Sequence, residues 1–93
     1  MSSHSSCLED IFSSRGRVKV LKTIIELEEV NISRLIKLTR LNYRTVVKHL
    51  EYLKKVGIVD EIVVSRTRIF RLNLLNPKVR LLIDLVEQLS DLR

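Results

Sequence analysis

The stretch from Leu41 to Gly57 reads L-N-Y-R-T-V-V-K-H-L-E-Y-L-K-K-V-G, and it constrains this chain more than any other. Asn42 is a good N-cap, because its side-chain oxygen can accept a hydrogen bond from the first helical turn. Val46, Leu50 and Leu53 then recur at i, i+4 and i+7, which predicts one apolar helical face. The closing glycine is a typical helix stop. The sequence therefore predicts a capped amphipathic helix over residues 42–56.

The opposite face of this helix is polar and basic at its front end, where it presents Tyr43, Arg44, Val47 and Lys48. A helix buried on one side with such a front end suits a DNA major groove. Arg44 and Lys48 lie one turn apart, so both can reach base edges or phosphates. We expect Arg44 to be the main reader of guanine and Tyr43 to contact sugar or phosphate.

The positive charge of the chain is concentrated around this helix. Residues 40–71 carry eight Lys or Arg and three Asp or Glu, a net charge of +5 out of +6 for the whole chain. Residues 1–39 have a net charge of +1, and residues 72–93 have none. This uneven distribution favours a polyanionic partner such as double-stranded DNA over an ordinary solvated surface.

Two helices are predicted before this one. The first spans about 15–28 and has a broad apolar face, although Glu26, Glu28 and Glu29 crowd its C-terminal end, where the helix dipole disfavours them. The second spans about 32–38, with Asn31 as its cap, and is too short to be stable alone. Residues 39–41 connect it to the basic helix, so the pair forms a helix-turn-helix.

After Gly57 the pattern changes to β-branched and alternating residues. Residues 58–64 and 67–74 predict two strands joined by a tight turn at Ser65-Arg66. The turn type stays open, because no glycine lies there. Arg66 and Arg68 are expected at the hairpin tip, where they can reach phosphates or a narrow minor groove.

Asn76-Pro77 predicts the start of a last helix that runs to about Asp91. Val79, Leu82, Val86 and Leu89 follow the spacing of a coiled-coil seam, which favours dimerisation. The alternative is that this helix packs onto its own domain. The fold class is thus mainly α with a β-hairpin, with residues 1–6 as a disordered tail, 7–75 as the DNA-binding domain and 76–93 as a dimerisation helix.

Four segments together resemble the arsenic-repressor-like (ArsR-type) winged helix-turn-helix regulators and their archaeal relatives. They are R-V-K-V-L at 17–21, N-I-S-R-L at 31–35, L-N-Y-R-T-V-V-K-H-L at 41–50 and L-K-K-V-G-I-V at 53–59. The resemblance covers about half of the chain closely and implies a homodimeric transcription regulator.

In that family the recognition helix enters the major groove, the wing touches the backbone, and the first and last helices form the dimer. The groove-facing positions it implies are Asn42, Tyr43, Arg44, Thr45, Val47 and Lys48. The dimer positions are Leu8, Phe12, Val79, Leu82, Val86 and Leu89. We expect His49 to cap or pack against a neighbouring helix rather than contact a base.

Further basic residues are expected to hold the DNA backbone: Arg34, Lys37, Arg40, Arg66 and Arg68, with Arg15, Arg17 and Lys19 as additional candidates. Arg40 stands where relatives usually have glycine. The backbone there either avoids a positive φ or accepts it at a cost of roughly 1 kcal/mol.

The metal-sensing members of the family carry paired cysteines on the helix that here reads I-S-R-L-I-K-L. This segment has no cysteine, histidine or acidic residue, so we expect no metal, no cofactor and no small-molecule ligand. The chain also lacks a catalytic triad, paired carboxylates in an apolar pocket and a phosphate-binding loop, which argues against an enzyme.

No apolar run approaches the roughly 20 residues that span a bilayer, and no secretion signal is evident. We therefore expect a cytoplasmic, nucleoid-associated protein. Two alternatives stay open beside the specific regulator: a chromatin-like protein that coats DNA without specificity, and a winged helix that binds proteins. The charge on residues 40–71 argues against the second alternative.

Overall fold

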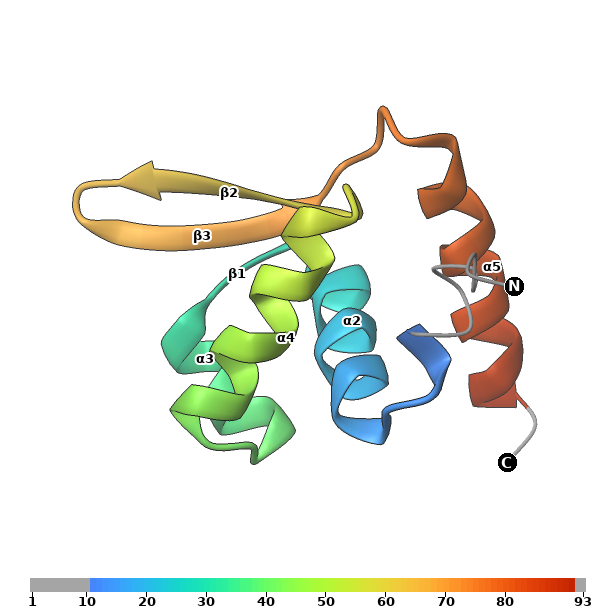
Figure 1. The fold of residues 1–93 in the computed structure, drawn as a ribbon, viewed down its shortest axis with the longest axis horizontal. Helices are drawn as coiled ribbons and strands as arrows, with labels where there is room; N and C mark the ends of the chain where they lie inside the picture. The colour runs from blue at the N-terminus through green and yellow to red at the C-terminus, as the bar shows by residue number, and fades with distance from the viewer. Residues whose placement is uncertain (1–10, 92–93) are drawn as a thin grey trace, which may run out of the picture.

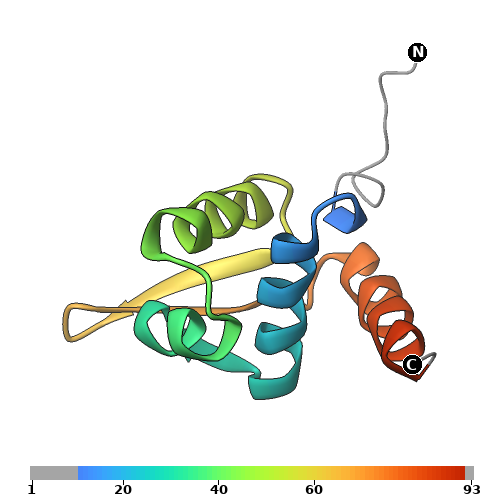
Figure 2. The ribbon, with the colours of Figure 1, turned by 90° about the horizontal axis from the view of Figure 1, so that it is seen from below.

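The computed structural model describes residues 11–91. The elements run in the order α2 (Arg15–Leu27), β1 (Glu29–Asn31), α3 (Ile32–Thr39), α4 (Tyr43–Lys55), β2 (Val59–Val64), β3 (Thr67–Leu72) and α5 (Pro77–Asp91). Figure 1 shows α2, α3 and α4 grouped at the centre, with the β2–β3 hairpin projecting from one side and α5 on the other. Figure 2 shows the same separation from below, so the hairpin and α5 occupy opposite ends of the molecule.

The helices begin where the sequence predicts. Asn31 accepts a hydrogen bond through Oδ1 from the Arg34 amide at 2.9 Å, and Asn42 accepts one from the Thr45 amide at 2.8 Å. Each cap satisfies an amide that the first turn of its helix leaves without a helical partner. Asn76 Oδ1 accepts a hydrogen bond from the Lys78 amide at 3.0 Å, and α5 begins at the intervening residue, Pro77. The caps predicted at Asn31 and Asn42 and the helix start predicted at Asn76-Pro77 are confirmed.

A short strand, β1, was not predicted from the sequence. Only three residues long, it pairs antiparallel with β3, so the sheet has the order β1-β3-β2. The strand accounts for one of the three glutamates that were expected at the C-terminal end of α2. Glu28 adopts a positive φ of 70° and ends the helix, while Glu29 lies opposite Arg71 with its carboxylate 3.7 Å from the guanidinium. Glu29 thus lies in a strand rather than at a helix end.

The hairpin turn resolves a question that the sequence left open. Ser65 and Arg66 have φ values of 49° and 72°, and the flanking residues Val64 and Thr67 are paired across the turn. Positive φ at both central residues is the signature of a type I′ turn, whose twist matches that of the two strands. The turn forms here with two non-glycine residues, both of them exposed.

The core runs through all the helices and the sheet. Phe70 on β3 is fully buried between β1 and β2, where it is opposite Val30 and Glu61. The buried faces of α2 and α4 meet there, as the predicted stripe of Val46, Leu50 and Leu53 requires.

The predicted coiled-coil seam on α5 needs a correction. Val79, Leu82 and Val86 are only 1%, 1% and 3% exposed within a single chain, because they belong to its own core. They are therefore not free to meet a partner. Leu89 and Leu81 are 49% and 46% exposed and lie outside this buried face. Phe12 is half-buried, and Leu8 lies outside the described residues.

Candidate nucleic-acid interface

Helix α4 presents its predicted polar face to solvent. Tyr43 is 58% exposed, Arg44 and Lys48 are exposed, and Thr45 and Val47 are half-buried beside them. Asn42 is also exposed, but its side-chain oxygen is already used as the helix cap. The first two turns of α4 therefore offer a polar and basic surface that the other described residues leave uncovered.

Residues from α3 and the following turn extend this surface. Arg34 and Lys37 on α3 are exposed, and so is Arg40. Arg40 adopts a left-handed conformation with φ of 63°, so it accepts the strained backbone that glycine would tolerate more easily. Its amide donates to the Ile36 carbonyl at 2.9 Å, which closes the end of α3.

His49 packs against the neighbouring helix α2, as expected. It is 5% exposed, and its Nδ1 accepts a hydrogen bond from Arg17 Nε at 3.3 Å. The Arg17 guanidinium also lies over the Tyr52 ring, 4.0 Å from its centroid. Arg17 thus joins α2 to α4, whereas Lys19 donates to the Thr39 carbonyl at 3.2 Å and supports the end of α3. Arg17 and Lys19 thus support α4 and α3, the two helices that carry the candidate DNA-binding surface.

Burial lowers the pKa of His49 below its ordinary value of 6.5, and Arg17 and Lys48 lower it further by repulsion. The unfolded chain therefore binds a proton at His49 before the folded protein does. We expect the free energy of unfolding to fall as the pH drops from about 7 towards 5.5. Denaturant unfolding at a series of pH values in this range measures the effect. In His49→Gln the free energy of unfolding should depend less steeply on pH than in the wild type. An unchanged slope would contradict a neutral His49.

The wing carries one exposed arginine at its tip and one that is held by carboxylates. Arg66 lies in the turn and is exposed. The prediction that Arg68 also lies at the tip is wrong: it pairs with Val63 along the strand, and its Nε donates to Glu61 Oε2 at 2.5 Å. Lys54 on α4 reaches the same carboxylate at 2.6 Å. No local pattern in the sequence indicates this cluster, because its members come from three different elements.

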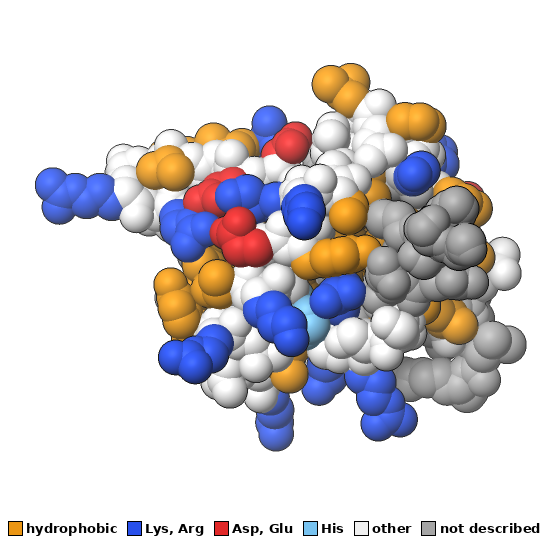
Figure 3. All heavy atoms as spheres, in the orientation of Figure 1, with side chains coloured by type: hydrophobic (Ala, Val, Ile, Leu, Met, Phe, Trp, Pro, Cys, Tyr) orange, Lys and Arg blue, Asp and Glu red, His pale blue; other side chains and the backbone are white. Residues whose placement is uncertain are grey.

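Figure 3 shows how this affects the charge of the surface. Acidic side chains lie among the basic ones where α4 meets the hairpin, whereas the charged side chains seen on this face around α3 and the start of α4 are basic. The hairpin tip and the start of α4 lie towards the same end of the molecule in both ribbon views. One end thus combines an uncovered basic helix start with a basic wing tip.

Comparisons with solved structures identify this architecture. The chain is similar to HlyU from Vibrio cholerae with a TM-score of 0.76 and 21% identity, over 88% of this chain and 86% of that one. It is similar to the transcriptional repressor PagR of Bacillus anthracis with a TM-score of 0.71 and 22% identity, over 85% and 87% of the two chains.

A third similar structure is the homodimeric winged helix-turn-helix DNA-binding domain of Mb0332 from Mycobacterium bovis, a possible ArsR-family transcriptional regulator. The TM-score is 0.70 at 20% identity, over 98% of this chain and 88% of that one. The fold is a winged helix-turn-helix. No family model and no curated protein matches the sequence.

In this winged helix-turn-helix, α3 and α4 are the helix-turn-helix and the β2–β3 hairpin is the wing. Among the described residues, no group of three or more His, Cys, Asp or Glu side chains could hold a metal ion. Within the same part of the chain, no helix is both long and apolar enough to cross a membrane.

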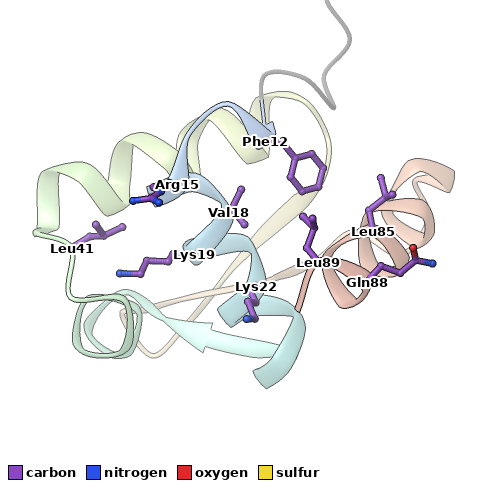
Figure 4. A pocket seen from close by; sticks show the side chains of 10 residues that line it. Phe12, Arg15, Val18, Lys19, Lys22, Leu41, Leu85, Gln88 and Leu89 are labelled. Carbon is purple, nitrogen blue, oxygen red and sulfur yellow. The ribbon is translucent and has the colours of Figure 1, made fainter. Parts of the chain in front are cut away.

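A second surface lies away from this end, between α2 and α5. It is a groove of about 1180 Å³, whose apolar lining includes Phe12, Val18, Leu85 and Leu89. Figure 4 shows Phe12, Leu85 and Leu89 facing one another, while Lys19 and Lys22 lie along α2. The described lining residues include three basic and no acidic side chains. The groove is thus apolar at its centre and positive along one edge.

Proposed function

We propose that this protein is a sequence-specific DNA-binding transcription regulator that acts as a homodimer on the nucleoid. The observation that carries the proposal is the uncovered start of α4, where Tyr43, Arg44 and Lys48 are exposed and the described residues form no ion pair with either cation. An exposed, basic helix of this kind fits the major groove, where side chains can read base edges.

Each part of the surface has a distinct role in the proposal. Arg44 reads guanine, Lys48 and Tyr43 contact bases or backbone nearby, and Thr45 and Val47 approach the groove floor. Arg34, Lys37 and Arg40 hold the backbone beside the helix, and Arg66 contacts the backbone or minor groove from the wing. Asn42 contributes mainly by capping α4, because its oxygen accepts the Thr45 amide.

The proposed dimer forms through the exposed residues of α5 and the groove that this helix lines beside α2. Leu81 and Leu89 are about half exposed, and the groove beside them is lined by further apolar side chains. Covering such surface is favourable by roughly 25 cal/mol per Å². Asp84 and Glu87 of α5 are exposed and opposite in charge to Arg15 and Lys22 along the groove, so a second copy of α5 would be attracted to it.

Selection of bound duplexes from a random pool tests the proposal. A specific homodimer should enrich an inverted repeat, and its affinity for that repeat should exceed its affinity for random DNA by about 10³-fold or more. A protein that coats DNA would bind both with the same salt dependence and enrich nothing. Absence of any duplex binding at low salt would contradict DNA binding altogether.

Replacing both exposed leucines, Leu81→Lys with Leu89→Lys, should separate the dimer into monomers. The two introduced ammonium groups would have to be buried beside the basic edge of the groove, which costs more than the lost apolar contact. Sedimentation measures the mass, and the affinity for the selected inverted repeat should fall in parallel. Asp84→Asn with Glu87→Gln is a milder control that retains the leucines. A mutant that stays dimeric would contradict this interface.

A further inference from the structure

The shortest ion pairs between the wing and α4 are made by one carboxylate that two cations share. Glu61 Oε1 lies 2.6 Å from Lys54 Nζ, and Glu61 Oε2 lies 2.5 Å from Arg68 Nε. A second donor of Arg68, Nη2, reaches Oε1 at 3.2 Å. Glu61 is on β2, Arg68 on β3 and Lys54 on α4, so the cluster connects both wing strands to the recognition helix.

The cluster is partly shielded from water, which strengthens it relative to a surface ion pair. The Glu61 side chain is 15% exposed, whereas Glu51 is 54% exposed and lies farther off, at 3.4 Å from Arg68 and 3.8 Å from Lys54. Hydrogen bonds from Arg68 and then Lys54 lower the pKa of Glu61 to about 2. The carboxylate therefore remains ionised at any pH at which DNA binding would be measured.

The position of the cluster along the hairpin matters. Glu61 is opposite the buried Phe70, which anchors the base of the wing in the core. Beyond it, Val63 and Val64 are 64% and 56% exposed, so core packing no longer holds the strand there. The cluster thus lies between the anchored base and the free tip of the wing. If the cluster were lost, the outer part of the hairpin could change its angle to α4, and this would displace Arg66 at the tip.

We propose that Glu61 is a positioning residue for DNA binding, which holds the wing at the angle that lets Arg66 and the start of α4 contact one duplex together. This inference rests on the proposed function. Its role is indirect: Glu61 is itself negative and contacts no DNA.

The sign of the effect separates positioning from simple electrostatics. Removing a negative charge near a DNA-binding surface strengthens binding, because the field attracting the polyanion increases. Glu61→Gln removes such a charge and keeps the shape of the side chain. If Glu61 positions the wing, the same substitution weakens binding instead, by about as much as loss of the wing-tip contact in Arg66→Ala.

The experiment is a double-mutant cycle on the affinity of the full chain for the duplex selected by the wild type. Glu61→Gln and Arg66→Ala are measured singly and together by fluorescence anisotropy at several salt concentrations. We expect each single variant to lower the slope of log affinity against log salt by about one phosphate contact. The double variant should be no weaker than either single one, because both remove the same contact.

Asp60→Asn is the matched control, since Asp60 is exposed and adjacent to Glu61 on β2. It removes the same charge and should leave affinity unchanged or raise it. Tighter binding by Glu61→Gln would overturn the proposal, and so would a loss that adds fully to that of Arg66→Ala. If Glu61→Gln unfolds at the assay temperature, Glu61→Asp keeps the charge but withdraws the carboxylate from Lys54 and Arg68, and the same cycle applies. A wild type that binds no duplex contradicts the proposed function rather than the role of Glu61.

Discussion

Arg44→Ala should weaken binding to the selected duplex by about 1–3 kcal/mol, or roughly 5- to 150-fold. Arg44 is exposed in the first turn of α4, and its guanidinium can donate two hydrogen bonds to the O6 and N7 of one guanine. Alanine leaves those acceptors without a partner in the groove. Fluorescence anisotropy with the selected duplex and with its guanine-substituted variants measures the loss and locates the base.

Comparing the loss of affinity on the selected duplex with the loss on random DNA distinguishes base recognition by Arg44 from electrostatic attraction. Arg44→Ala should cost much more on the selected duplex than on random DNA, because random DNA gains only the electrostatic part of the contact. Lys55→Ala is the matched control: it removes one exposed cation from the other end of the same helix. Equal losses for Arg44→Ala on both duplexes would show that Arg44 only attracts DNA.

Phe70→Ala should lower the free energy of unfolding by about 3–5 kcal/mol. Phe70 is fully buried, and its strand is the middle one of the sheet, paired with β1 on one side and β2 on the other. Truncation leaves a cavity where the base of the wing meets the helices. Small domains are stable by only about 5–15 kcal/mol, so this loss is a large share of the total. Denaturant unfolding followed by circular dichroism measures it.

Val63→Ala is the control for this substitution. It shortens an apolar side chain of the same hairpin, but Val63 is 64% exposed. Its effect should stay within about 0.5 kcal/mol. Comparable losses at Phe70 and Val63 would mean that the sheet is not anchored through Phe70. The Phe70 substitution should also weaken DNA binding, since an unanchored wing cannot keep Arg66 in place.

Much of the architecture could be predicted from local sequence. Asn31, Asn42 and Asn76 mark helix starts because a cap acts within three residues of itself, and the apolar spacing of α4 indicates which side is buried. The exposure of Arg44 and Lys48 follows from the same spacing. By contrast, β1 is three residues long and exists because β3 lies beside it, a partner about 40 residues away along the chain.

Local sequence determined the helices, their caps, the hairpin and the concentration of positive charge, because each depends on residues a few positions apart. The tertiary structure alone decided which stripe of α5 is buried and where Arg68 points. On α5 two overlapping leucine-rich stripes compete, and the core covers the one with Val79, Leu82 and Val86. Arg68 turns to Glu61 rather than outward because the register of the hairpin and the end of α4 bring Lys54, Glu61 and Arg68 together.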